Sequence, residues 1–598
     1  MKELEYPFDA AYIIKKRKSL KKALLADGTS RIRKKIAVFG GSTTSDIVKT
    51  LELFLLDAGI EPEFYESEYA QYFQDAMFPD ETLLSFKPDI VFIHTTNRNV
   101  TDWPEMTDTT EQIDEKLHTE INRFTAMWKS IAEKFHCPII QNNFEMPLYR
   151  LLGSRDAWDI HGRTNFLTRL NEAFYAYARE NESFYIHDLN FVSADYGLKE
   201  WSNPLFWNMY KYAMCFEAIP SFAFSVSHII KSIFGKNKKA LALDLDNTLW
   251  GGVVGDDGVD GIEIGQETGV SQSYYEFQTY VKQLKSLGIV LTVCSKNDHE
   301  NAIAGLNHPE GALRPDDFVI IKANWENKDR NIAETAAELN ILPDSIVFAD
   351  DNPAEREIVR TQIKGAAVPD MDGVENYITT IDRSGFFEVT TFSEDDLKRN
   401  EMYKKNALRA AEMASFGDYN DYLKSLEMHA VIDDFIPVYL ARITQLTNKS
   451  NQFNVTTRRY TPAEMESVFE DDGYIRLYGK LIDNSETTAS FPSSSAEKIG
   501  TALDIDLWLM SCRVLKRDME FAMLDRLVER CREVGVETIN GYYYPTAKIK
   551  MVSDLFGRFG FTKTEEHEDG STVWQLRVAD YKPQNHVIEV FGNDHAEA

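Results

Sequence analysis

Two aspartates stand directly after a short apolar run, at a spacing that suits metal-assisted acid–base chemistry. Asp244 and Asp246 follow the run 241–243, Thr248 comes next, and two glycines then turn the chain. Ligands bind outside the carboxyl ends of the strands of an open α/β sheet, and carboxylates there can share a hard cation such as Mg²⁺ through their oxygen atoms. One carboxylate can attack phosphorus while the other carries the proton. A strand with an ordinary polar turn gives the same pattern, so further motifs must decide between the two readings.

Three further motifs follow in the order that phosphoryl transfer through an aspartyl phosphate requires. Ser295 ends one apolar run, the acidic pair Asp350 and Asp351 follows another, and Lys328 lies between them as an ammonium that can hold a phosphoryl oxygen. With the first two aspartates they supply a nucleophile, a proton carrier, a metal site and fixed donors for the equatorial oxygens. Two adjacent carboxylates repel each other unless a cation lies near them. We therefore predict that Mg²⁺ is the cofactor.

The motifs resemble, in the same order, those of the haloacid dehalogenase (HAD) superfamily of phosphatases. The resemblance implies that Asp244 is the nucleophile and a metal ligand. It implies that Asp246 is the general acid/base, with its backbone carbonyl on the metal. The acidic pair Asp350 and Asp351 completes the metal site, and which of the two touches the ion is left open. The residues assigned to the phosphate are Ser295, Lys328, Thr248, Lys296 and Asn297.

Longer stretches narrow the resemblance to the FkbH-like branch, HAD subfamily IIIC. The segments that carry it are 244–255, 293–298 and 348–356, with independent matches at 445–460 and 507–515. The resemblance implies an enzyme that takes 1,3-bisphosphoglycerate, removes phosphate and loads the glyceryl group onto an acyl carrier protein. We therefore expect a small phosphorylated metabolite as substrate and an acyl carrier protein as a possible partner.

The N-terminal part of the chain alternates strand and helix patterns, which predicts a parallel sheet with flanking helices. It looks like an SGNH-type hydrolase, with Ser42 at the position of the nucleophile and Asn97 as the conserved-block asparagine of that fold. The Asp-x-x-His pair that such a fold needs is replaced by the adjacent His187 and Asp188. A serine without a positioned base is a weak nucleophile. We prefer a structural or substrate-covering role for this domain.

The C-terminal part looks like a GNAT-type acyltransferase. In that fold an Arg/Gln-x-x-Gly-x-Gly turn opens a helix and cradles pyrophosphate on backbone amides. Here the segment 513–518 has neither glycine and ends in Asp518, which would repel phosphate. This argues against coenzyme A binding in the usual manner. A thiol would suit acyl transfer, with Cys512 as the candidate and Cys294 as the second choice; a buried apolar role is the alternative for both.

We predict three α/β domains, SGNH-like, HAD Rossmann-like with a minimal cap, and GNAT-like. The expected division is a helical segment over 1–34, the SGNH-like domain over 35–235, the HAD phosphatase domain over 236–390, a helical linker over 391–425 and the GNAT-like domain over 426–598.

Composition excludes several classes of protein. The chain has 598 residues and a formal net charge of −30, and a surface that binds nucleic acid would need an excess of Lys and Arg. The sequence shows no secretory signal and no apolar stretch of about eighteen residues, so we expect no membrane attachment. The amphipathic helix predicted over 11–25 is expected to pack on the next domain. Five scattered cysteines without metal spacing favour a reducing, cytoplasmic setting.

Three hypotheses for the function remain open. The first is a Mg²⁺-dependent phosphatase that couples phosphate removal to glyceryl transfer. The second is a plain phosphohydrolase in polysaccharide or secondary-metabolite biosynthesis. The third is a non-enzymatic docking scaffold for a carrier protein, which the complete set of charged motif residues argues against.

Overall fold

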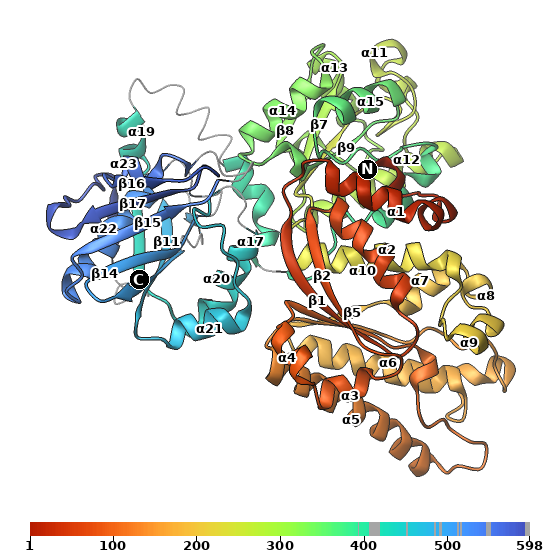
Figure 1. The fold of residues 1–598 in the computed structure, drawn as a ribbon. Coiled ribbons are helices and arrows are strands. Elements are labelled where there is room, and N and C mark those ends of the chain that lie inside the picture. The colour runs from red at the N-terminus through yellow and green to blue at the C-terminus, as the bar shows by residue number, and fades with distance from the viewer. Residues whose placement is uncertain are drawn as a thin grey trace. The chain divides into compact units, whose positions relative to one another are not determined.

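The computed structural model describes residues 1–392, 394–405, 419–449, 453–483, 486–488, 493–510, 514, 517–545 and 552–591. The chain divides into two units, Met1–Lys236 and Asn237–Ala598, each with its own sheets (Figure 1). The HAD and GNAT-like domains predicted from the sequence both fall within the second unit. No helix in the described part of the chain is both long enough and apolar enough to cross a bilayer.

The first unit is built on a five-stranded parallel sheet of order β2-β1-β3-β4-β5. The inner strands β1, β3 and β4 bury most of their residues because helices cover both faces of the sheet, whereas most residues of the edge strand β2 are only partly buried. The alternating α/β pattern expected from the sequence is confirmed. The strands are β1 (Ile32–Gly40), β2 (Ile60–Glu66), β3 (Ile90–His94), β4 (Ile139–Asn142) and β5 (Phe184–His187).

Ten α-helices lie among the described residues of the first unit. One face of the sheet packs against α1, α2 and α10, and the other against α3, α5 and α6. They are α1 (Ala10–Ala26), α2 (Ser45–Asp57), α3 (Tyr72–Met77), α4 (Glu81–Phe86), α5 (Thr110–Phe135), α6 (Arg163–Glu180), α7 (Leu189–Tyr196), α8 (Leu198–Trp201), α9 (Pro204–Tyr210) and α10 (Ile219–Ile233).

The basic, amphipathic stretch near the N-terminus forms α1. Its start is capped by the side chain of Asp9, which accepts a hydrogen bond from the backbone of Tyr12. The apolar face, with Ile13, Leu20 and Leu24, is buried in the same core as α2 and α10. The helix therefore packs on the domain that follows it in the chain, as expected, and its lysines line the outward side.

The second unit begins with a four-stranded parallel sheet of order β8-β7-β6-β9. The strand that leads into Asp244 is central, and its neighbours lead into Ser295 and Asp350. The elements are β6 (Ala240–Leu243), α11 (Val254–Asp257), α12 (Gly269–Ser286), β7 (Val290–Ser295), α13 (His299–Leu306), β8 (Ile320–Ala323), α14 (Lys328–Glu338), β9 (Ile346–Ala349), α15 (Pro353–Gln362) and α16 (Tyr377–Arg383). The predicted linker contains α17 (Glu394–Leu397) and α19 (Tyr419–Ser425).

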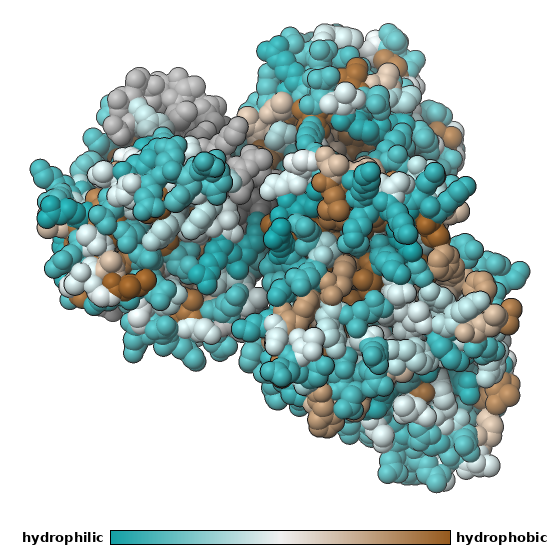
Figure 2. Space-filling view, viewed as in Figure 1, coloured by the Kyte–Doolittle hydropathy of each residue, from teal (hydrophilic) through white to brown (hydrophobic). Residues whose placement is uncertain are grey.

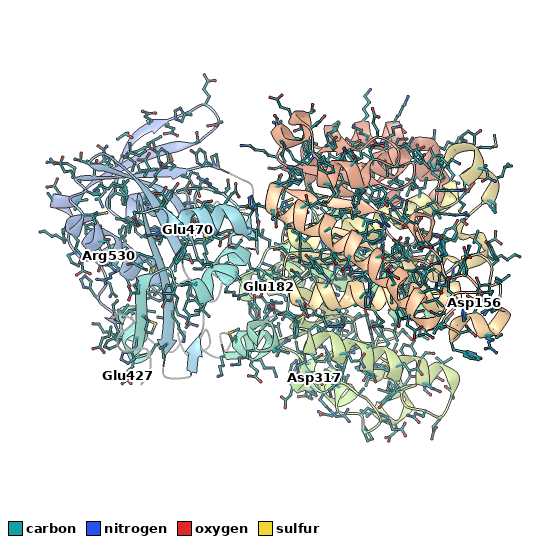
Figure 3. The ribbon with its side chains drawn as sticks, turned by 90° about the horizontal axis from the view of Figure 1, so that it is seen from below. Asp156, Glu182, Asp317, Glu427, Glu470 and Arg530 are labelled. Atoms are coloured by element: carbon teal, nitrogen blue, oxygen red, sulfur yellow. The ribbon has the colours of Figure 1, made fainter. Side chains whose placement is uncertain are left out.

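The remaining residues form a larger, mainly antiparallel sheet of order β16-β17-β15-β14-β13-β11-β10-β18, with β12 beside β11. The helix α22 packs in its core, and Arg530 of this helix is labelled in Figure 3. Arg530 pairs with Asp434 at the end of β10 at 2.9 Å. Its elements are β10 (Met428–Asp434), α20 (Pro437–Lys449), α21 (Pro462–Glu470), β11 (Tyr474–Asp483), β12 (Glu486–Thr488), β13 (Ser493–Ile499), β14 (Ala502–Leu509), α22 (Met519–Glu533), β15 (Thr538–Tyr543), α23 (Leu555–Arg558), β16 (Thr562–Glu566), β17 (Thr572–Arg577) and β18 (Ile588–Phe591).

Two neighbouring parallel strands of this sheet, β14 and β15, pair over only three residues each, 502–504 with 538–540. Beyond that point the chain itself, at 453–455, contacts both strands. Val455 donates its backbone N–H to the carbonyl of Trp508 at 3.2 Å and accepts one from Tyr544 at 3.3 Å, and the backbone N–H of Met510 donates to Phe453 at 3.0 Å. The segment 453–455 therefore fills the gap between the two strands.

The visible surface is predominantly hydrophilic, as the high charge content requires (Figure 2). Cys531 is fully buried on α22. Cys512, the candidate thiol, lies outside the described residues.

Candidate active site

Three parallel strands bring the predicted motif residues to one edge of the β8-β7-β6-β9 sheet. Asp244 follows β6, Ser295 ends β7, and Asp350 and Asp351 follow β9. Because Leu243 is in register with both Val293 and Ala349, the residues after these strands emerge side by side. The backbone N–H of Asp244 donates to the carbonyl of Ala349 at 3.0 Å, which fixes the nucleophile position directly beside the acidic pair.

Asp244, Asp350 and Asp351 form a compact acidic trio. One carboxylate oxygen from each lies within 4.8 Å of the others. Asp350 is completely buried and Asp244 is 6% exposed. Hard divalent cations take carboxylate oxygens in such a cluster, so the donor set fits Mg²⁺. Both members of the acidic pair offer an oxygen to this cluster.

The electrostatics of the trio point the same way. Burial, with the charge of Asp244 added to it, raises the pKa of Asp350 to about 7 although Lys328 opposes the shift. The same two causes raise the pKa of Asp351. One ammonium cannot neutralise three carboxylates, so the site favours a further positive charge.

Lys328, the first residue of α14, is the only lysine or arginine among the described residues whose side chain forms an ion pair with the trio. Its Nζ lies 2.5 Å from Asp350 Oδ2 and 3.1 Å from Asp244 Oδ1, and the side chain is 3% exposed. The contact with Asp244 is close enough for an ion pair, but its alignment is poorer than that of the hydrogen bond to Asp350. Burial lowers the pKa of Lys328, yet the two carboxylates outweigh it and raise the pKa overall. The lysine therefore stays charged, next to the nucleophile.

Asp246 stands apart from the trio, and its carboxylate accepts three hydrogen bonds. The donors are the indole N–H of Trp250, the backbone N–H of Val254 and the side-chain amide of Asn297. Burial raises the pKa of Asp246 despite the donors. A carboxyl group whose pKa is raised holds a proton more readily, which suits a general acid.

The residues assigned to the phosphate have different surroundings. Ser295 is buried at the end of β7. The backbone N–H of Asp351 donates to the hydroxyl of Thr248 at 3.1 Å. Lys296 is paired with Glu355 at 2.7 Å, and Asn297 donates to Asp246. The structure thus brings Thr248 and Ser295 to the sheet edge with the trio, whereas the side chains of Lys296 and Asn297 are engaged elsewhere.

Two supports of the site had no role in the sequence analysis. Arg356, from the same segment as the acidic pair, donates to the backbone carbonyls of Asp350 at 3.0 Å and Asp351 at 2.8 Å. The hydroxyls of Tyr274 and Tyr377 both donate to the carbonyl of Asn247, which has a left-handed φ of 54°. Arg356 lies seven residues after the end of β9, inside the motif segment 348–356, so its position in the sequence could have pointed to it. The two tyrosines are remote in sequence from Asn247, and no motif points to them.

The second-choice thiol does not suit nucleophilic chemistry. Cys294 is buried, and burial raises the pKa of its thiol. Thiolate formation is thereby disfavoured. Its Sγ contacts the backbone carbonyl of Lys328 at 3.6 Å, so it packs under the site.

Ser42 in the first unit lies in the turn after β1 and is 2% exposed, and its hydroxyl has no hydrogen-bond partner among the described residues. Asn97 donates to the carbonyls of Glu145 and Met146. Asn99 is the residue that reaches this turn, donating to the carbonyl of Gly41 at 2.9 Å.

His187 does not serve as a base for this serine. Its Nδ1 is bonded to Asn142 Oδ1 at 2.9 Å and its Nε2 to Ser225 Oγ at 3.0 Å. Both ring nitrogens are therefore engaged away from Ser42.

Comparison with known proteins gives a match to a family and an extensive match to a solved structure. Residues 35–231 match the family described as the FkbH N-terminal domain. A crystal structure of the N-terminal part of a Bacteroides fragilis protein, containing a phosphatase domain and complexed with Mg, is 30% identical. The match covers 63% of this chain and 99% of that chain, with a TM-score of 0.58. No curated protein matches the chain.

Acetyltransferase structures match a smaller part. The ribosomal-protein-S18-alanine N-acetyltransferase from Escherichia coli is 11% identical over 26% of this chain and 99% of that one, with a TM-score of 0.21. A GNAT superfamily phosphinothricin acetyltransferase from Sinorhizobium meliloti is 19% identical over 26% and 95%, with a TM-score of 0.21. Similarity at this level does not decide the fold of the matched part.

Proposed function

The chain belongs to the FkbH-like family of proteins that contain a HAD-type phosphatase domain, and on this premise we propose that it is a Mg²⁺-dependent phosphatase acting through an aspartyl phosphate. The observation that supports the proposal most directly is the acidic trio, whose carboxylate oxygens lie within 4.8 Å of one another beside the buried ammonium of Lys328. Such a cluster of buried charge is costly for a structural role alone.

The residues divide the reaction between them. An oxygen of Asp244 attacks phosphorus, the bond to the leaving oxygen breaks, and Asp246 gives that oxygen its proton. Water then attacks the phosphorylated Asp244, Asp246 takes the proton from the water, and phosphate leaves. Lys328 and the hydroxyl of Ser295 hold phosphoryl oxygens through both steps. Mg²⁺, held by the trio, would neutralise the charge that builds up on those oxygens.

The variant Asp244→Asn tests this proposal, because it removes the nucleophilic charge and changes little volume. We expect phosphate release from p-nitrophenyl phosphate to fall by on the order of a thousand-fold or more. Circular dichroism and thermal unfolding should stay as in the wild type. Asp316→Asn, at an exposed aspartate outside the trio, is the control and should keep the wild-type rate. Turnover in Asp244→Asn, or full activity after exhaustive chelation, would contradict the assignment.

We further propose that the substrate is a small phosphorylated metabolite resembling 1,3-bisphosphoglycerate, with phosphate removal coupled to glyceryl transfer to an acyl carrier protein. The support is the resemblance to FkbH-like proteins. The assay incubates the protein with Mg²⁺, 1,3-bisphosphoglycerate and a carrier protein, followed by mass spectrometry of both proteins. A glyceryl adduct on Cys512 or on the carrier is the expected result, and free phosphate alone would favour a plain phosphohydrolase.

The plain phosphohydrolase is the second candidate, and one feature near the start of α22 favours it. Asp518 precedes this helix with a left-handed φ of 60°, where a glycine-rich turn would be needed to cradle pyrophosphate. A carboxylate there opposes an anionic ligand. We keep the SGNH-like and GNAT-like folds of the outer domains as part of this proposal, with supporting rather than catalytic roles.

A further inference from the structure

The three hydrogen bonds on the Asp246 carboxylate are divided unequally between its two oxygen atoms. Oδ1 accepts from Trp250 Nε1 at 2.9 Å and from the backbone N–H of Val254 at 3.0 Å. Oδ2 accepts from Asn297 Nδ2 at 2.9 Å. A carboxylate oxygen has two lone pairs. The two donors saturate Oδ1, whereas Oδ2 keeps one lone pair for a proton.

The donors on Oδ1 cannot reverse their roles. An indole nitrogen and a backbone nitrogen donate and never accept. A proton placed on Oδ1 would therefore displace one of the two hydrogen bonds and leave a buried donor unpaired, which is costly. A proton on Oδ2 leaves all three hydrogen bonds in place.

The indole of Trp250 is held in this orientation by close packing. The residue is 1% exposed and belongs to the core that includes Val254 and Phe277. On the neighbouring helix α13, a Cβ added at Gly305 would lie 2.8 Å from Cη2 of the indole, so the absence of a side chain at this position makes room for the ring. The close packing therefore holds the indole N–H against Asp246.

We propose that Trp250 is a positioning residue that confines the transferred proton to Oδ2 of Asp246. The inference rests on the proposed phosphatase function, because it concerns the same general acid/base. Trp250 thus has a role in the reaction beyond that of a buried core residue. Its importance depends on how much the leaving group needs a proton.

Trp250→Phe tests the proposal, since phenylalanine keeps a ring in the core and lacks the N–H. With glycerol phosphate, whose alkoxide must be protonated as it leaves, we expect kcat/KM to fall on the order of ten- to a hundred-fold. With p-nitrophenyl phosphate, whose leaving group is stable as an anion, the fall should be less than about three-fold. Because kcat/KM reports the steps up to the first departure of the leaving group, slow hydrolysis of the phosphorylated enzyme does not disturb the comparison.

A matched control is available in Trp325. Its indole also donates to an aspartate, Asp298, at 2.9 Å, but the side chain is 71% exposed. Trp325→Phe should leave both substrates at wild-type kcat/KM. Gly305→Ala is the complementary variant, because it displaces the ring and retains the N–H, and it should reproduce the substrate-dependent loss.

The outcomes separate this inference from the proposed function. An equal loss with both substrates in Trp250→Phe, or no loss with either, overturns the positioning role. Absence of Mg²⁺-dependent phosphate release in the wild type, or its persistence in Asp244→Asn, overturns the proposed function instead.

Discussion

The two parallel sheets end in polar residues of very different character. In the second unit, the strand ends present the acidic trio, and Lys328 at the start of α14 pairs with it. In the first unit, the last residues of β3, β4 and β5 are His94, Asn142 and His187, and they bond to one another in a row that ends at Ser225 on α10. Asn142 is oriented by the carbonyl of Thr95, which accepts from its Nδ2 at 3.2 Å.

The difference lies in charge balance. The row in the first unit is neutral, because burial lowers the pKa of His94 to about 3 and burial, with a smaller contribution from His94, lowers that of His187 to about 3. Its members bond to one another across three strands, although His94 Nε2 is buried with no hydrogen-bond partner among the described residues. The trio has three carboxylates for one ammonium and needs a ligand to complete it. The same position in a sheet therefore serves stability in one unit and chemistry in the other.

Among the variants that compare the two units, the largest effect should come from removing the ammonium beside the trio. In Lys328→Met we expect kcat/KM for phosphate release to fall on the order of a hundred- to a thousand-fold, because a phosphoryl oxygen loses its donor. Without Mg²⁺ the free energy of unfolding should also fall by about 3 kcal/mol. Denaturant unfolding with and without Mg²⁺ measures this.

Lys322 provides the surface counterpart for that experiment. It also pairs with two carboxylates, those of Glu334 and Glu338. Because ion pairs on the surface contribute little to stability, Lys322→Met should lower the free energy of unfolding by less than about 1 kcal/mol. Equal losses of unfolding free energy in Lys328→Met and Lys322→Met would show that the trio holds no uncompensated negative charge.

Metal binding should have the next largest effect, and it should stabilise the protein through the trio. At a Mg²⁺ concentration about a hundred times its Kd, the expected gain is about 2.7 kcal/mol. Asp350→Asn should abolish most of the shift in calorimetric melting temperature that Mg²⁺ produces. Asp316→Asn should retain it, and a shift that survives in Asp350→Asn would place the ion elsewhere.

Lowering the pH should destabilise the first unit, because the neutral row contains the buried histidines His94 and His187. A histidine whose pKa is lowered in the folded state binds its proton more readily when the protein is unfolded. Its contribution to folding stability is therefore complete above the unfolded pKa of about 6.5 and is lost as the pH falls below that value. Between pH 7 and 5.5 we expect the free energy of unfolding to fall by about 1 kcal/mol for each of His94 and His187.

Hydrogen exchange of β3 to β5, followed by mass spectrometry on the full chain and corrected for the intrinsic rate, measures the opening of these strands. His187→Gln removes one of the titrating groups and should flatten the pH dependence. An unchanged profile in that variant would show that the row does not govern the opening.

The smallest effect is expected at Ser42. Ser42→Ala removes a buried hydroxyl that has no partner among the described residues, so the free energy of unfolding should stay within about 1 kcal/mol of the wild type. Phosphate release should remain within two-fold of the wild-type rate (about the scatter of such assays). A large loss of activity would give the first unit a direct part in the reaction.

The order of the motifs was sufficient to predict which residues meet at the edge of the second unit's sheet. Apolar runs that each end in a polar residue become neighbouring parallel strands, and their ends must then lie together. The trio with Lys328 therefore follows from sequence spacing. The α/β pattern of the first unit was predictable for the same reason.

Side chains in the loops after the strands could not be placed in this way. Lys296 and Asn297 follow Ser295 directly, yet one pairs with Glu355 and the other with Asp246. Likewise Asn99, two residues beyond Asn97, is the one that reaches Gly41. Orientation in irregular backbone depends on φ and ψ values that no repeating pattern specifies.

The segment 453–455 occupies the space that a ligand would need in order to bind between β14 and β15. Such a molecule competes with the protein's own backbone, because it must first break the three hydrogen bonds that join this segment to Trp508, Met510 and Tyr544. Its apparent affinity is then reduced by the free energy of expelling the insertion. Ligand binding and displacement of the segment are then one linked equilibrium. A ligand that binds tightly between the strands should therefore speed hydrogen exchange of the Val455 amide.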